Sequence, residues 1–277
     1  MKNLHFDYAF YISYTADVNR CYYTIKSVPQ DSARQKIKHF DIEMDPQSNP
    51  EWGYDSLGNR YIWGCNEKPH KDFMFHLTGD AVCGLADYEE VATENEAMIY
   101  RHGTRFTNAG ESLLAFFAKC EEEGKLSEMD SALKKADFLM EKLQAKFTYE
   151  KEVTDVETTA EEAFSNGKGV CQDYAHILIS LLLLAGCSSR YVTGFTIGEG
   201  ATHAWVEVLS EGKWYGYDPT AGTRVADAHI KIGVGRDASE CQINRGIMHG
   251  GGRQGLVTKL SVTESGQGAD YLRKGLM

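Results

Sequence analysis

The amino-acid sequence predicts an α+β protein in which helices pack on an antiparallel sheet, preceded by an all-β, sandwich-like N-terminal unit. Three observations predict this fold class. Aromatic-rich, alternating segments fill residues 1–88, helical spacing dominates between residues 111 and 185, and strand-like segments fill most of the remainder. We therefore expect two domains, residues 1–88 and residues 89–277, which is a reasonable division for a chain of 277 residues.

The N-terminal region reads as a series of short strands separated by turn-forming stretches such as VPQD and DSLGN. Each segment alternates in polarity or is rich in aromatic residues, both of which favour strands. The segments are FDYAFYISY, RCYYTIKSV, KHFDIEM, NRYIWG and DFMFHLTGDAVC. Strands at this spacing predict an antiparallel sandwich or a barrel-like unit.

Helices are expected next. Residues 128–147 have apolar side chains at three- and four-residue spacing, which predicts an amphipathic helix, and residues 111–120 also look helical. The segment TTAEEAF (158–164) has the threonine and glutamate spacing of a capping box. A further helix is expected over residues 171–185, where a glycine ends it. The expected strands that follow are SRYVTGFTI, HAWVEVL, KWYGYD, HIKIGVG and GLVTKLSVT.

Composition excludes some classes of function. The formal net charge of −11 argues against non-specific binding to nucleic acid, which depends on Lys and Arg contacts to phosphate. No apolar run is long enough to span a membrane, and the N-terminus lacks the apolar core of a signal peptide, so a cytoplasmic location is the expectation. The seven cysteines include no C-x-x-C pair and the histidines show no ligand spacing, so we expect no disulfide framework, no metal and no cofactor.

Cys171 is the first candidate for catalysis. It lies at the expected start of a helix, where unpaired N–H groups and the helix dipole favour the thiolate, which is the nucleophilic form. Its backbone N–H is a candidate donor to an oxyanion. Gly167 and Gly169 are expected to form the preceding turn and to allow close approach of a substrate. An inert cysteine at a helix start would fit the same pattern.

A cysteine nucleophile needs an imidazole base and a group that orients it. His203 begins the strand HAWVEVL, whereas His176 lies further along the same helix as Cys171 and points elsewhere. The next strand, KWYGYD, returns by a short hairpin and brings Asp218 level with His203. Trp205 shares a face with His203 and would either line the site or pack in the core.

Two other acids compete with Asp218 for the role of orienting the imidazole. Glu207 shares a face with His203 but lies about 13 Å further along the strand, and Asp227 follows the hairpin. Asp218 itself would also suit a plain turn before a proline. Cys171, His203 and Asp218 remain the most sensible triad by geometry.

Three blocks of the sequence, GKGVCQDYAHILISLLLLAGCSSRYVTGF, THAWVEV and WYGYDPTAG, resemble the signature blocks of the transglutaminase-like superfamily, and in particular its bacterial cysteine protease type. The segments QDSARQKIKHFDIEMDP and YDSLGNRYIWG resemble the β-rich N-terminal region often joined to these enzymes. The resemblance implies a papain-like core in which Cys171 is the nucleophile, His203 the general base and then acid, and Asp218 the orienting carboxylate.

The chain departs from the family pattern at two points. The loop GEGAT before His203 is short, which implies an open cleft. No tryptophan lies upstream near Cys171 to act as the second oxyanion donor of animal-type transglutaminases; Tyr149 is a candidate substitute, or else a core aromatic.

The expected function is a cysteine-dependent amide hydrolase, a protease or amidase, that forms a thioester acyl-enzyme with a peptide or protein substrate. A transglutaminase that uses an amine acceptor is the alternative, as is a non-catalytic binding module on the same fold. The sequence leaves the acyl acceptor, the natural substrate and the oligomeric state open.

Overall fold

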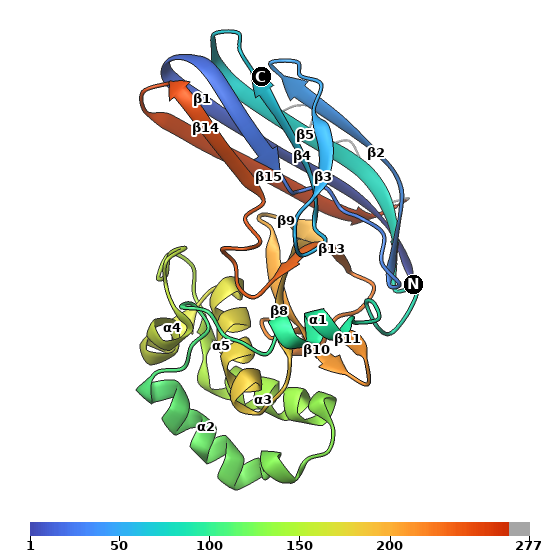
Figure 1. Cartoon of the computed structure of the whole chain (residues 1–277), viewed down its shortest axis with the longest axis vertical. Helices are drawn as coiled ribbons and strands as arrows, with labels where there is room; N and C mark the ends of the chain where they lie inside the picture. The colour runs from blue at the N-terminus through green and yellow to red at the C-terminus, as the bar shows by residue number, and fades with distance from the viewer. Residues whose placement is uncertain (266–277) are drawn as a thin grey trace.

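The long first strand, β1 (Lys2–Ile25), organises the upper half of the molecule in this computed structural model, which describes residues 1–265 (Figure 1). Its first half pairs with β5 (His70–Cys83) and with β15 (Gln254–Glu264). The chain then bends back, and the second half pairs with β4 (Arg60–Asn66) and β14 (Asn244–Gly250). Both halves of one strand therefore lie in facing layers of the expected sandwich.

Aromatic side chains fill the space between these layers. Phe6, Tyr8 and Phe10 occupy alternate positions of β1 and are almost completely buried, as the two-residue period of a strand requires. Phe10 stacks on Phe75 with ring centroids 5.4 Å apart. Outer strands extend the layers. β2 (Gln35–Asp45) pairs with β5, and β3 (Glu51–Tyr54) pairs with β4.

The chain leaves the sandwich after β5, close to the boundary expected at residue 88, but it returns at the other end. We expected GLVTKLSVT to join the C-terminal sheet; instead it forms β15 and pairs with β1, where Leu260 and Val262 face the sandwich core. The alternating pattern of a strand identifies the strand but not its partner, because pairing between distant segments is decided by the whole fold.

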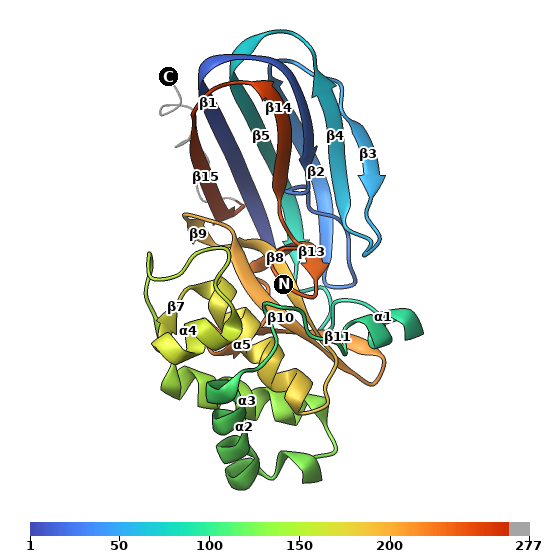
Figure 2. The ribbon, with the colours of Figure 1, turned by 60° about the vertical axis from the view of Figure 1, so that its left-hand side comes forward.

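The helices lie in the lower half of the molecule (Figure 2). The expected helices over residues 111–120, 128–147 and 171–185 are all present, and Thr159 caps another with Glu162, as in a capping box. Within residues 1–265, no helix is long and apolar enough to span a membrane. The helical segments are α1 (Glu94–Ile99), α2 (Glu111–Gly124), the 3₁₀ turn η1 (Leu126–Glu128), α3 (Ala132–Lys146), α4 (Ala160–Asn166) and α5 (Cys171–Leu184).

A second, antiparallel sheet lies between the helices and the sandwich, with the strand order β12-β11-β10-β8-β13. Helix α5 packs on β10 and β8, and its apolar side chains form one core with Tyr191, Val206 and Tyr217 from the sheet. The prediction of helices on an antiparallel sheet is confirmed. The strands are β8 (Ser189–Thr196), β10 (His203–Ser210), β11 (Lys213–Asp218), β12 (Thr223–Arg224) and β13 (His229–Gly235).

Three short strands connect these parts. β6 (Thr148–Tyr149) and β7 (Lys168–Gly169) form a parallel pair directly before α5. β9 (Gly198–Glu199) pairs with β15, so the loop before His203 is attached to the sandwich. The start of α5 and the start of β10 are thus each held by a neighbouring strand.

Candidate active site

Cys171 is the first residue of α5, and a buried carboxylate fixes the turn in front of it. Asp173 accepts a hydrogen bond from the backbone N–H of Val170 at 2.7 Å and another from the Thr154 hydroxyl at 2.7 Å. Burial raises the pKa of Asp173, and these hydrogen bonds partly offset the effect. The carboxylate satisfies a free N–H at the helix start, where the dipole also favours negative charge.

The glycine before Cys171 makes room for that carboxylate. A Cβ atom on Gly169 would lie 2.4 Å from the Oδ2 atom of Asp173, which is well inside contact distance. Gly167 has a φ of +72° at the C-terminal end of α4, a conformation that favours glycine. Both glycines therefore shape the turn, and Gly169 does so through a neighbouring side chain rather than through a substrate.

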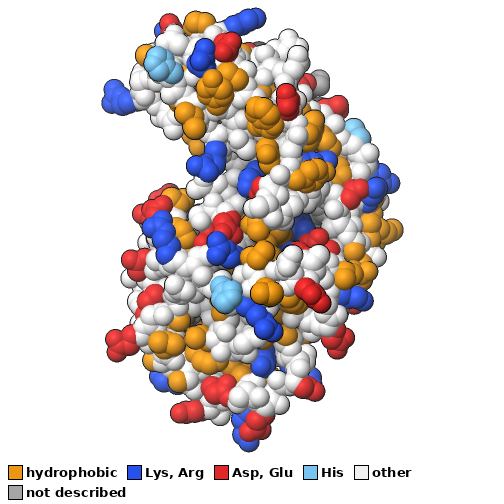
Figure 3. Space-filling view, viewed as in Figure 1, with side chains coloured by type: hydrophobic (Ala, Val, Ile, Leu, Met, Phe, Trp, Pro, Cys, Tyr) orange, Lys and Arg blue, Asp and Glu red, His pale blue; other side chains and the backbone are white. Residues whose placement is uncertain are grey.

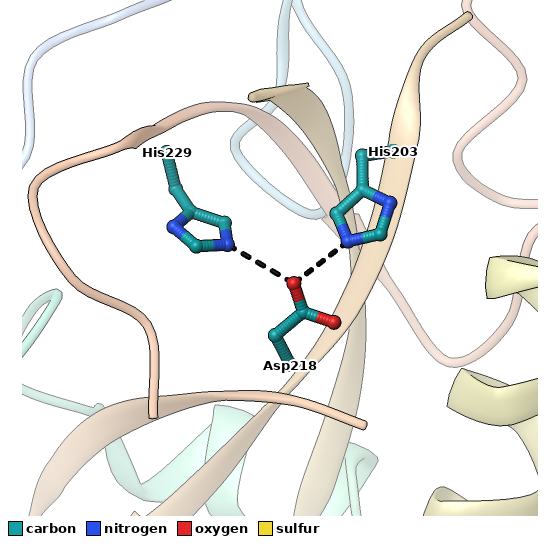
Figure 4. Close-up of side chains that lie close together, drawn as sticks. All are labelled: His203, Asp218 and His229. Atoms are coloured by element: carbon teal, nitrogen blue, oxygen red, sulfur yellow. Dashed lines mark hydrogen bonds and ion pairs between the residues drawn. The ribbon is translucent and has the colours of Figure 1, made fainter. Parts of the chain in front are cut away.

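His203 and Asp218 meet across the hairpin of β10 and β11, as the sequence predicts. The Nε2 atom of His203 lies 2.8 Å from Oδ2 of Asp218 (Figure 4). The other carboxylate oxygen accepts the backbone N–H groups of Thr220 at 3.0 Å and Ala221 at 3.1 Å. Burial alone would raise the pKa of Asp218, but these hydrogen bonds and the two histidines beside it hold that pKa far below its usual range.

The imidazole of His203 interacts with Cys171 as well as with Asp218. Burial lowers the pKa of His203, but the hydrogen bond to Asp218 and the interaction with Cys171 outweigh burial and raise the pKa to about 10. Because Nε2 is bound to Asp218, Nδ1 is the atom left for the thiol, and it points away from Asp218 in Figure 4. The Cys171 side chain is partly exposed, so a reagent can reach this group of three residues.

A second histidine lies at this site and was not predicted from the sequence. His229, the first residue of β13, places Nε2 3.2 Å from the same Oδ2 atom of Asp218, and its side chain is only 10% exposed. Within residues 1–265 its buried Nδ1 atom has no hydrogen-bond partner. The sequence signal was limited to the fact that the expected strands HAWVEVL and HIKIGVG both begin with a histidine. The structure places both histidines opposite the same end of β8.

Two regions of the chain match known protein families. Residues 123–219, which include Cys171, His203 and Asp218, match the transglutaminase-like superfamily. Residues 5–81 match the bacterial transglutaminase-like N-terminal region. The chain belongs to the transglutaminase-like superfamily. The two matched regions lie in the β-rich N-terminal part of the chain and in the part that carries the three candidate residues.

One solved structure supports the fold of this transglutaminase-like protein, and two curated relatives share part of its sequence. A "putative cysteine protease" from Cytophaga hutchinsonii has a TM-score of 0.74 at 16% identity, covering 98% of this chain and 92% of that one. An uncharacterized protein from Mycobacterium leprae is 32% identical over 130 residues, which is 43% of this chain and 46% of that protein. One from Mycobacterium bovis is 32% identical over 127 residues, 40% of each. The chain spans less than half the length of these curated relatives.

Trp205 and Tyr149, the two aromatic residues expected near the site of this transglutaminase-like protein, differ in exposure. Trp205 has no exposed surface and packs edge-on against His229, with ring centroids 5.3 Å apart. It is therefore a core residue beneath the site and does not line a cleft. Tyr149 is 45% exposed and pairs with Gly169, and burial and then Cys171 raise the pKa of its hydroxyl. Tyr149 is therefore exposed and close enough to Cys171 to interact with it electrostatically, and its role as an oxyanion donor stays a prediction.

The rival acids have other partners. Glu207 is completely buried, where it binds Arg190 at 2.5 Å and Lys231 at 3.2 Å. Asp227 pairs with the N-terminal ammonium group at 2.8 Å. Glu207 belongs to a buried charge cluster on the side of the sheet away from α5. Asp218 is thus the acid that the fold presents to His203.

Cys171, His203 and Asp218 do not line the groove between the two halves of the molecule. That groove has a volume of about 1070 Å³ and opens on the left in Figure 3. Its walls include Tyr22, Trp63 and Ile247 from the sandwich, and Arg236 and Ser239 from the loop after β13. None of the residues around Cys171 contributes to it, because the loop after β13 lies at the opposite end of that strand from His229.

Proposed function

We propose that this chain is a cysteine-dependent amide hydrolase that acts through Cys171, His203 and Asp218. The observation that carries the proposal is the position of His203, whose Nε2 binds a buried carboxylate while its ring interacts with the thiol at the start of α5. A nucleophile, a base and an orienting acid in this order are what acyl transfer through a cysteine requires.

Each residue has one chemical task. The Cys171 thiolate attacks the carbonyl carbon of a peptide or protein amide, and the C–N bond breaks as His203 gives its proton to the leaving amine. The resulting thioester is attacked by water, His203 takes a proton from that water, and the acid product leaves with the thiolate restored. The backbone N–H of Cys171 and the hydroxyl of Tyr149 are the candidate donors to the oxyanion.

An amine in place of water would give a transglutaminase, because the thioester is the same in both reactions. The match to a transglutaminase-like core is the observation that keeps this second function open. Hydrolysis stays the first choice since water needs no binding site of its own. The substrate, and with it the choice between protease and amidase, is part of the proposal.

Alkylation followed by intact-protein mass spectrometry tests the nucleophile. Iodoacetamide at neutral pH is expected to label Cys171 first, and His203→Ala is expected to slow this labelling by about 100-fold because the imidazole no longer assists ionisation. Cys65, which is exposed but lies on β4 of the sandwich, is the matched control, and His203→Ala should leave its labelling unchanged. Equal labelling rates at the two cysteines would overturn the proposal.

A second measurement identifies the acceptor. The protein is incubated with a library of peptides and glutaminyl amides, with and without a primary amine, and both the acyl-enzyme and the products are weighed. Hydrolysed products in both samples indicate an amidase or protease, and amine adducts indicate a transglutaminase. Neither product, together with full biological activity of Cys171→Ala, would instead indicate a non-catalytic binding module.

A further inference from the structure

Two histidines share one carboxylate oxygen, although the proposed mechanism uses only His203. The Nε2 atoms of His203 and His229 lie 2.8 Å and 3.2 Å from Oδ2 of Asp218 (Figure 4). The three ligand atoms all lie within 4.8 Å of one another. We propose that His203, Asp218 and His229 form a binding site for a divalent transition-metal ion of the Zn²⁺ type, and that the bound ion reversibly blocks the thiol chemistry.

The donor set suits such an ion. Two imidazole nitrogens and one carboxylate oxygen are typical ligands of Zn²⁺ at about 2.0–2.2 Å, and a tetrahedral site then keeps ligand atoms about 3.3 Å apart. The spacing in this cluster is close enough that small rotations of the two rings would complete three of the four positions. The fourth position is left for water, because the Cys171 thiol faces the other nitrogen of the His203 ring.

The cluster is built into the fold. Its members begin β10, end β11 and begin β13, which places each on a different strand of one sheet. The remaining oxygen of Asp218 is held by the N–H groups of Thr220 and Ala221, so the carboxylate is already oriented. Trp205 packs edge-on against the His229 ring. Supporting contacts of this kind fix the orientation of metal ligands.

Metal binding would stop His203 from acting as a base. An ion on Nε2 forces the ring proton onto Nδ1, which is the atom that faces the thiol. That nitrogen then has no lone pair to accept a proton from Cys171, and Asp218 is no longer bound to the ring. The blocking effect depends on the proposed function, but the metal site itself does not, because it requires no catalysis.

Direct binding measurements test the site without an activity assay. The intact protein is stripped with EDTA, exchanged into metal-free buffer and titrated with ZnCl₂ in a calorimeter, and separately with Co²⁺ in a spectrophotometer. We expect one saturable site with visible absorption bands of four-coordinate Co²⁺. Cys171→Ser, which lacks the nucleophile, should retain this site, so metal binding and the proposed function can fail independently.

Matched variants locate the site. His229→Gln is expected to weaken Zn²⁺ binding by about tenfold or more, because one of three ligands is lost. His39→Gln is the control: His39 and His5 flank Asp80 at 3.3 Å and 3.1 Å on the sandwich surface, so it removes a histidine from a similar but exposed cluster. Binding that is unchanged in His229→Gln, or that is lost in His39→Gln, would overturn the assignment.

Inhibition is measured as the rate of Cys171 alkylation. Saturating Zn²⁺ should slow that rate by about tenfold or more in the unmodified protein, and EDTA should restore it. Absence of any saturable site for Zn²⁺ or Co²⁺ at 100 μM of either metal in the unmodified protein would refute the proposal without relying on any variant.

Discussion

Gly169 lies so close to Asp173 that a Cβ atom on the glycine would sit 2.4 Å from the carboxylate oxygen that caps α5. That oxygen accepts the N–H of Val170, the residue directly before Cys171. Gly169 and Asp173 lie two residues before and two residues after Cys171. The position of the thiol therefore depends on the absence of a side chain at residue 169, which leaves room for the buried Asp173 carboxylate.

Gly169→Ala should displace the Asp173 carboxylate and disturb the start of α5. We expect the free energy of unfolding to fall by about 1–3 kcal/mol, as for a buried hydrogen-bonding group that loses its partner, and Cys171 alkylation to slow. Gly212→Ala is the control, since Gly212 has a φ of +73° in open space in a distant turn. It should cost about 1 kcal/mol through backbone strain and leave Cys171 alkylation unchanged. Denaturant titration and timed labelling measure both effects.

Asp218→Asn should leave the site intact but impair its chemistry. The amide does not stabilise a protonated His203, so we expect kcat to fall by roughly 10³- to 10⁴-fold with little change in KM. Asp227→Asn makes the same chemical change at the N-terminal ion pair, and it should leave kcat unaltered. Steady-state kinetics on an amide substrate identified from the library measures kcat and KM for both variants. A similar loss of kcat in both variants would contradict the role assigned to Asp218.

Stability should decline at alkaline pH as His203 loses its proton. Although burial opposes protonation, Asp218 and Cys171 raise the pKa of His203 from the usual 6.5 to about 10. A raised pKa means that the folded state holds the proton more tightly. The stabilising contribution is therefore complete below pH 6.5 and disappears as the pH rises through about 10. Unfolding free energies at pH 6, 8 and 10 should show this decline, and Asp218→Asn should flatten it.

Glu207→Ala should be among the most destabilising single changes in the chain. Glu207 is fully buried between Arg190 and Lys231, so its removal leaves two buried cations with less compensation, at a cost of about 3–5 kcal/mol. Glu96→Ala is the comparison: its side chain also binds Arg190, at 3.1 Å, but is 28% exposed, so we expect a loss of about 1 kcal/mol or less. Thermal and denaturant unfolding measure the stability of both variants. An equal loss of unfolding free energy in Glu207→Ala and Glu96→Ala would show that burial does not determine the strength of these contacts.

Spacing rules between residues close in sequence were enough to predict part of the candidate site. The pairing of His203 with Asp218 follows from a short hairpin, in which the end of one strand returns beside the start of the other. The place of Cys171 at a helix start follows from the glycines and the apolar run around it. Both inferences use neighbours in sequence, where spacing fixes geometry.

Contacts between distant segments were not accessible in this way. His229 enters the site because β13 pairs with β8, although β8 and β10 separate β13 from the strand that carries Asp218. No spacing rule brings His229 to that carboxylate. The sequence does not decide whether Trp205 packs in the core or lines the cleft, because the covering of a sheet face depends on elements elsewhere in the chain. The return of β14 and β15 to β1 was missed for the same reason.

The pairing of β14 and β15 with β1 restricts how the two halves of the molecule can move relative to one another. Residues 84–243 form an insertion within the chain path of the sandwich, anchored at both of its ends and tied a third time where β9 joins β15. Several connections of this kind restrict rotation of the lower half about any single hinge. We therefore expect access to Cys171 to depend on local rearrangements, with the sandwich as a rigid support for the lower half.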